Sequence, residues 1–111
     1  MSKIINLTPH TVKIIGENGE VVAEYPSTGN ARVNSNFSEV GKVDGFPILK
    51  TTYGETDGLP NPDGETTYIV SMVVAMANPH RSDIVSPNTA PQAVVRDASG
   101  AVFGVRSFSR Y

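Results

Sequence analysis

Residues 66–79 read TTYIVSMVVAMANP. The first five, TTYIV, are β-branched or aromatic, so they favour a buried strand. Ser71 is a preferred helix N-cap, and the next six residues include two Met and two Ala, which favour a helix despite two valines. Pro79 disfavours helical backbone at Asn78, so the helix would end there after about two turns. A continuous strand over residues 67–77 is the alternative, since periodicity does not distinguish short apolar runs.

Turn residues predict three hairpins on either side of this stretch. The paired segments are residues 11–15 with 20–25, 39–43 with 46–51, and 93–97 with 101–108. The first turn contains Asn-Gly and the second is Asp-Gly, both of which tolerate the positive φ of tight hairpin turns. The third turn, at residues 98–100, ends in glycine. Pro47 lacks an N–H donor, so its strand is expected at a sheet edge.

Three polar segments, residues 26–36, 54–65 and 78–92, are predicted as loops. The last of them contains a short apolar pair, Ile84-Val85. We therefore expect one domain over residues 1–111 in the α+β class. It would be mainly β, with six to eight short strands in hairpins and one short helix near residues 71–77.

Composition excludes several classes of protein. The net charge is −2, which argues against binding double-stranded nucleic acid, because such proteins usually present a basic face. The chain contains no Cys, so disulfides, thiolate catalysis and zinc sites of the Cys type are excluded. The opening residues MSKIINLTP lack a long apolar segment, and the longest apolar run, residues 68–77, is too short for a bilayer. We expect neither a signal peptide nor a membrane partner.

Ser71 is the first candidate ligand-binding residue. A strand that leads into a helix exposes unpaired backbone N–H groups, which bind phosphate or carboxylate. The alternative is an ordinary N-cap, because no glycine allows the close backbone approach typical of a phosphate loop.

The densest group of reactive side chains is His80-Arg81-Ser82-Asp83. Arg81 could bind a phosphate or carboxylate through two nitrogens, and His80 could donate to the same anion. The alternative is that Arg81 and Asp83 pair with each other and hold the loop in place.

Two further groups are candidates for binding. His10 with Thr8 could form a polar pocket wall, although a lone histidine is more often structural. In a continuous last strand, Arg106, Phe108 and Arg110 would share one face and could grip a nucleotide. The alternative is that the arginine stems cover apolar surface.

Two segments complete the set of candidates. Tyr53 is an additional aromatic side chain on which a base could stack. The four acids of the segment 54–65 do not have the spacing of a calcium loop, so a solvated segment is expected and no metal is predicted. These acids are Glu55, Asp57, Asp63 and Glu65.

Catalytic motifs are weak. Ser71, a histidine and Asp83 could in principle form a hydrolytic set, but Ser71 is flanked by Val70 and Met72 rather than by a nucleophile elbow. The two histidines lie far apart and form no zinc motif. We therefore expect a protein without enzymatic activity and without a cofactor.

Short motifs along the whole chain resemble a group of small tailed-phage and prophage proteins without assigned activity. The resemblance rests on Ile5–His10, Ala31–Val33, Asp44–Pro47, Tyr53–Glu55, Gly58–Pro60, Tyr68–Ser71, Arg81–Asp83, Val95–Asp97 and Gly104–Arg106. It implies a phage gene product made in the bacterial cytoplasm, and it supplies no catalytic residues.

These observations lead to one principal functional hypothesis. We expect a non-enzymatic, homo-oligomeric phage protein that binds an anionic nucleotide, in its most specific form as a sponge for a nucleotide-type immune signal. The alternatives are a structural accessory of the virion and a direct inhibitor of a host defence protein. For the inhibitor, the acids of residues 54–65 would imitate nucleic acid, although four acids are few.

Overall fold

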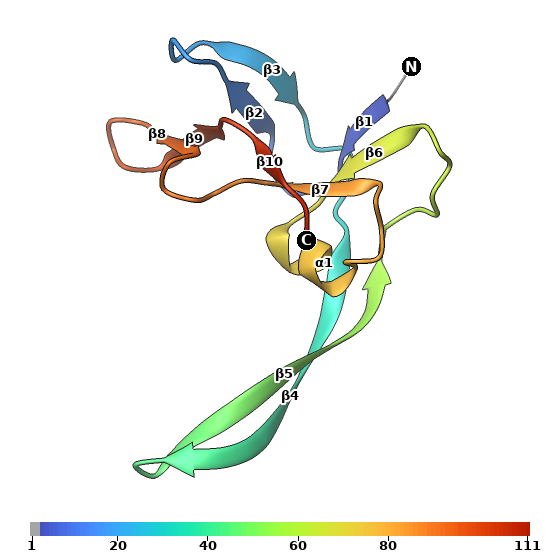
Figure 1. Cartoon of the computed structure of the whole chain (residues 1–111), viewed down its shortest axis with the longest axis vertical. Helices are drawn as coiled ribbons and strands as arrows, with labels where there is room; N and C mark the ends of the chain where they lie inside the picture. Colours follow the sequence, from blue (N-terminus) through green and yellow to red (C-terminus); the bar gives the residue numbers. More distant parts are fainter. Residues whose placement is uncertain (1–2) are drawn as a thin grey trace.

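The computed structural model describes residues 3–111, which form ten strands and one short helix (Figure 1). The apolar stretch after residue 65 folds as predicted into β6 (Thr66–Ile69) followed by α1 (Met72–Ala77). Ser71 occupies the N-cap position with extended backbone, and its side chain makes no capping hydrogen bond. Asn78 ends the helix one residue before Pro79. The α+β, mainly β class is confirmed, with ten strands in place of six to eight.

The first sheet has the strand order β1-β6-β7-β10. Strands β1 and β7 run parallel to β6, and β10 runs antiparallel to β7. The strands of this sheet besides β6 are β1 (Lys3–Asn6), β7 (Ile84–Pro87) and β10 (Phe108–Ser109). The expected loop over residues 78–92 is therefore wrong at β7, where Ile84 and Ser86 are buried. Four residues are too few for a clear alternation, and pairing with β6 determines the strand.

The second sheet has the order β3-β2-β9-β8 and contains two of the predicted hairpins. Its strands are β2 (Val12–Ile15), β3 (Val21–Tyr25), β8 (Val94–Arg96) and β9 (Val102–Val105). The two hairpins meet through a parallel contact between β2 and β9. Gly104 allows this approach, because a Cβ at that position would lie 2.8 Å from the carbonyl oxygen of Lys13.

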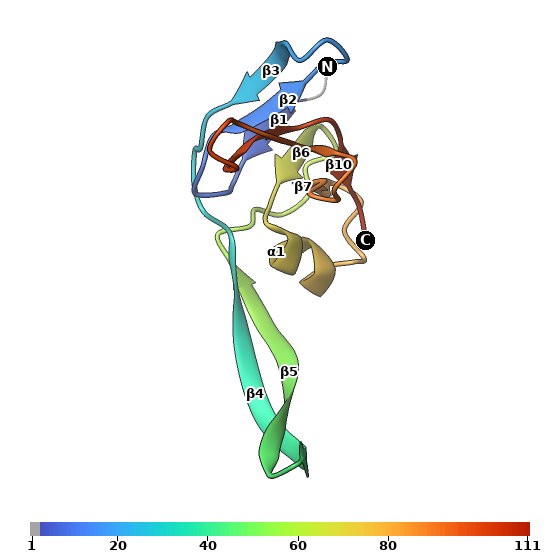
Figure 2. The same ribbon diagram turned by 90° about the vertical axis from the view of Figure 1, so that its left-hand side faces the viewer.

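The third sheet is a two-stranded hairpin of β4 (Arg32–Val43) and β5 (Phe46–Asp57), which we call the arm. Asp44 and Gly45 both have positive φ, as the predicted tight turn requires. The arm is much longer than expected, so residues 32–36 and 54–57, predicted as loop, are strand. Figures 1 and 2 show it extending away from the other two sheets.

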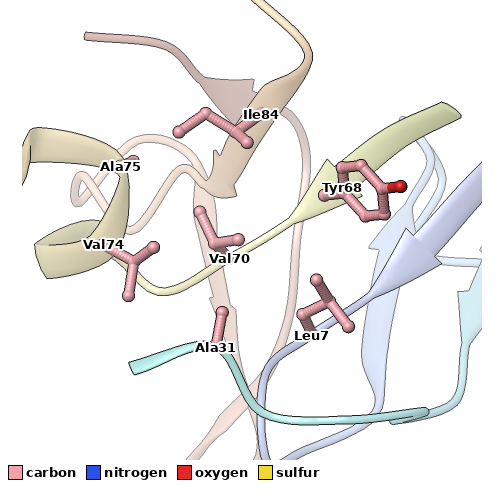
Figure 3. Close-up of a cluster of buried hydrophobic side chains, with 7 residues drawn as sticks. All are labelled: Leu7, Ala31, Tyr68, Val70, Val74, Ala75 and Ile84. Atoms are coloured by element: carbon pink, nitrogen blue, oxygen red, sulfur yellow. The ribbon is translucent and has the colours of Figure 1, made fainter. Parts of the chain in front are cut away.

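The hydrophobic core lies between the first sheet and α1 (Figure 3). Its fully buried members include Val70 and Val74, which are 0% and 1% exposed. The remaining buried side chains of this cluster are Leu7, Ala31, Tyr68, Ala75 and Ile84. The base of the arm is attached to this core, because the Asn78 amide donates to Thr56 Oγ1 on β5 (2.9 Å) and to the Val74 carbonyl (2.9 Å).

Asn6, at the end of β1, forms the central polar contact of the molecule. Its side chain is buried, and its Nδ2 donates to the carbonyl oxygens of His10 (2.7 Å) and Tyr25 (2.8 Å). Its Oδ1 accepts from the backbone N–H (2.9 Å) and the hydroxyl (2.7 Å) of Thr8. One amide therefore fixes the turn after β1 and connects the first sheet to β3 of the second.

We predict that Asn6→Ala lowers the free energy of unfolding by about 2–4 kcal/mol, because it removes the shared donor of two part-buried carbonyls and the buried acceptor of two Thr8 donors. Urea denaturation of both proteins measures the difference. Asn36→Ala, an exposed position on β4, is the matched control and should change stability by less than about 0.5 kcal/mol. Equal effects at the two positions would contradict a central role for Asn6.

Candidate binding cavity and the surrounding polar groups

A cavity of about 450 Å³ lies between the second sheet and the start of α1; we call it the first cavity. Four segments line it: residues 8–13, residues 71–72, Pro87 with Thr89, and residues 102–105. Its walls are mainly apolar, with side chains such as Val12, Met72 and Val105. A volume of this size is within the range of small-molecule sites.

A cation and an aromatic ring meet in this cavity. Lys13 on β2 and Phe103 on β9 come from the two strands that pair in parallel, and Lys13 Nζ lies 4.6 Å from the centroid of the Phe103 ring. This distance is typical of a cation–π contact. Phe103 is 40% exposed, so its ring remains accessible to a ligand.

The first cavity brings together three of the residues predicted from sequence. Thr8 and His10 line it from the turn after β1, and Ser71 lines it from the N-cap of α1. His10 and Ser71 are exposed, whereas Thr8 is buried and donates through its hydroxyl to Asn6 Oδ1. Lys13 and Phe103 were missed, because only the parallel pairing of two distant hairpins reveals that they are neighbours.

A second cavity of about 360 Å³ contains His80, Arg81 and Asp83. Arg81 Nε and Nη2 donate to the two carboxylate oxygens of Asp83, at 2.7 and 2.6 Å, and Nη2 also donates to the Pro60 carbonyl at 2.9 Å. The guanidinium lowers the pKa of Asp83, and the same hydrogen bonds raise the pKa of Arg81. Arg81 therefore pairs with Asp83, as in the structural alternative.

The predicted strip of Arg106, Phe108 and Arg110 does not form, because the last strand is interrupted. Strand β9 ends at Val105, and the chain leaves the second sheet before β10 pairs with β7 in the first. Arg106 Nη1 donates to the Gly16 carbonyl at 2.8 Å. Phe108 is half-buried on β10.

The other candidates are dispersed. Arg106 lines neither of the two cavities, so Arg81 and Arg106 do not converge on either of them. Tyr53 lies on the arm, 44% exposed. Glu55 and Asp57 lie on β5 of the arm, whereas Asp63 organises the turn before β6. Residues 3–111 contain no group of three or more His, Asp or Glu side chains arranged to hold a metal ion.

No family model, curated protein or solved structure matches the chain. Among residues 3–111, no helix is both long enough and apolar enough to cross a membrane.

Asp63, in the turn before β6, has the most strongly shifted pKa among the acids near these cavities. Its carboxylate accepts from the N–H groups of Glu65 (2.8 Å) and Thr66 (2.7 Å) and from the Thr66 hydroxyl (2.7 Å). The Glu65 N–H, the Thr66 hydroxyl and the Thr66 N–H together lower the pKa of Asp63 from 3.8 to about 2. A lowered pKa in the folded state means that the ionised carboxylate favours folding above the pKa of the unfolded chain.

We predict that this contribution to stability is present above about pH 4 and is lost as the pH falls toward about 2. Asp63→Asn should therefore lose less stability than the wild type across that window. Urea denaturation at each pH measures the free energy of unfolding of both proteins. Part of the loss should remain, because Asp83 and Asp97 also have lowered pKa values. Glu55→Gln, on the exposed β5, is the control variant. If the free energy of unfolding fell as steeply with pH in Asp63→Asn as in the wild type, the stabilising role of the Asp63 carboxylate would be refuted.

Proposed function

We propose that this chain is a non-enzymatic phage protein that sequesters a small nucleotide-type ligand in the first cavity. The observation that carries the proposal is the placement of Lys13 Nζ 4.6 Å from the Phe103 ring, two residues that line a mainly apolar cavity. Lys13 lies over one face of the Phe103 ring, so a base would stack on the other face while its phosphate binds the cation.

The remaining residues of the cavity fit the same ligand chemistry. The apolar walls and the accessible ring of Phe103 would hold a base, and Lys13 would bind its phosphate. His10 and Ser71 are exposed at the same cavity and would supply further hydrogen-bond donors to that phosphate. Because the Ser71 hydroxyl makes no capping hydrogen bond, it is free to contact a ligand.

The phage assignment is supported by the resemblance of the sequence motifs. Three of the motif segments, Ile5–His10, Tyr68–Ser71 and Gly104–Arg106, contribute residues to the first cavity. In its most specific form, the proposal is a sponge that removes a nucleotide immune signal in the host cytoplasm.

A binding role is also supported by the position of the residues that a hydrolase would need. Ser71 and His10 line the first cavity, but Asp83 lines the second and is paired with Arg81. The three side chains of the conceivable hydrolytic set therefore do not line a common cavity.

We predict micromolar or tighter binding of at least one member of a panel of cyclic di- and trinucleotides and ADP-ribose derivatives, measured by isothermal titration. Phe103→Ala and Lys13→Ala should each weaken binding by roughly 1–3 kcal/mol, through loss of stacking or of the cation. Phe46→Ala and Lys50→Ala, at exposed positions on the arm, are the matched controls. Absence of heat with the whole panel would refute the nucleotide form of the proposal.

A second candidate function, a structural accessory of the virion, is favoured by the arm and its exposed apolar side chains. Exposed apolar surface of this kind marks protein–protein contact. A direct inhibitor of a host protein would use the same surface. For the virion role we predict that mass spectrometry of purified phage particles detects the chain in constant proportion to the capsid protein, and its absence from particles would exclude that role.

A further inference from the structure

The arm presents its apolar side chains to solvent. Residues 34–55 are all exposed, from one strand through the turn to the other. The large apolar side chains among them are between 43% and 69% exposed. They are Phe37, Val40, Val43, Phe46, Ile48, Leu49 and Tyr53.

A two-stranded ribbon is marginally stable by itself in water, so the arm needs a surface that covers it. Its own domain does not supply one, because Figures 1 and 2 show the turn of the arm far from both other sheets. The radius of gyration, 16.4 Å, confirms the extended shape, since a compact chain of this length would have about 13 Å. Residues 3–111 therefore do not cover the arm, and we look to a second molecule for the covering surface.

The two faces of the arm differ in their charged residues. Directly opposed residues of an antiparallel pair share a face. The register therefore places Phe37, Leu49 and Tyr53 on one face, which we call face A, together with Glu39 and Lys42. Face B presents Val43 opposite Phe46, together with Ile48 and Lys50. Between the Ser35–Tyr53 pair and the turn, face A has one acid and one base, whereas face B has a base alone.

The edges of the arm are poorly suited to strand addition. Pro47 on β5 lacks an N–H donor, and the register shifts twice along the ribbon, once near Ser35 and once near Gly41. Proline and bulges are features that prevent pairing at sheet edges. A partner therefore has to pack against a face of the arm.

We propose that face A packs against face A of a second copy of this chain, with the two arms antiparallel about a two-fold axis. In such an interface each contact occurs twice, so Glu39 of each copy can lie against Lys42 of the other. Face B is less suited to self-association, because its Lys50 would find no acid to pair with on face B of the second copy. This inference goes beyond the proposed ligand binding and is independent of it.

The area of face A agrees with a weak dimer. Face A carries Phe37 and Tyr53, whose side chains have intrinsic areas of about 150–250 Å² each, and Leu49 adds a comparable exposed area. Weighted by their exposed fractions, these side chains of two arms together offer roughly 600–700 Å² of apolar surface, which is the size of a weak, transient interface. Nucleic acid fits this surface poorly, because the acid Glu39 and the base Lys42 share face A and it has no excess of positive charge.

Sedimentation equilibrium of the full chain tests the proposal. We expect the mass to rise from 11.8 kDa toward twice that value as the concentration approaches roughly 500 µM, because a small interface associates weakly. Phe37→Ser on face A should weaken dimerisation by at least about tenfold. Phe46→Ser, a more exposed residue on face B, is the matched control and should leave the dimer intact. A monomeric wild type, or equal effects of the two variants, would overturn the proposal and leave the arm to a different protein partner.

A charge exchange provides a second test that does not depend on apolar residues. Glu39→Lys and Lys42→Glu should each weaken the dimer roughly tenfold, because each creates two like-charge contacts. An equimolar mixture of the two variants should form a heterodimer of wild-type strength, since every contact then joins opposite charges. If the mixture dimerised as weakly as either variant alone, the face A arrangement would be overturned. Circular dichroism of each variant confirms folding, and nucleotide titration of the same variants reports separately on the first cavity.

Discussion

The hydrogen bonds of the Asn6 side chain hold the two larger sheets in place. Asn6 ends β1, and the next residue, Leu7, donates its N–H to the Ile69 carbonyl, so this part of the chain is fixed to β6. The Asn6 amide then reaches the Tyr25 carbonyl on β3 and the turn at Thr8. A buried amide that satisfies four partners cannot move without leaving several of them unpaired. The relative position of the sheets, and with it the first cavity, depends on this contact.

The first cavity depends on contacts between segments far apart in the sequence, whereas the arm depends on a local hairpin. The cavity arises where the turn after β1, the N-cap of α1 and β9 meet, and these segments are far apart in the sequence. The arm arises from one local hairpin that joins the body through Asn78 and the residues around Gly58. A Cβ at Gly58 would lie 2.9 Å from the Asn30 carbonyl, so the two ends of the arm approach closely there. No residue of the arm lines the first cavity.

Local chemistry predicts much of this fold. The three hairpin turns, the buried β6 and the helix that ends before Pro79 follow from turn residues, β-branching and capping. The parallel pairing of β1, β6 and β7 does not follow, because it joins strands of four residues whose partners are distant. The length of the arm does not follow either, since Asn34 and Asn36 are of a residue type depleted in strands. For the site, His10 and Ser71 were identified from their residue types, whereas Lys13 and Phe103 become neighbours only through the contact between β2 and β9.

The position of the arm in the chain has a consequence for folding. Strands β1 and β6 are separated by about 60 residues, and closing so long a loop is entropically unfavourable. The β4–β5 hairpin lies inside this loop and forms from residues adjacent in sequence, on the microsecond scale typical of hairpins. Once its ends are together, the remaining loop has an effective length of about 35 residues, which lowers the closure cost by roughly half a kcal/mol. Formation of the arm thereby lowers the entropic cost of pairing β1 with β6.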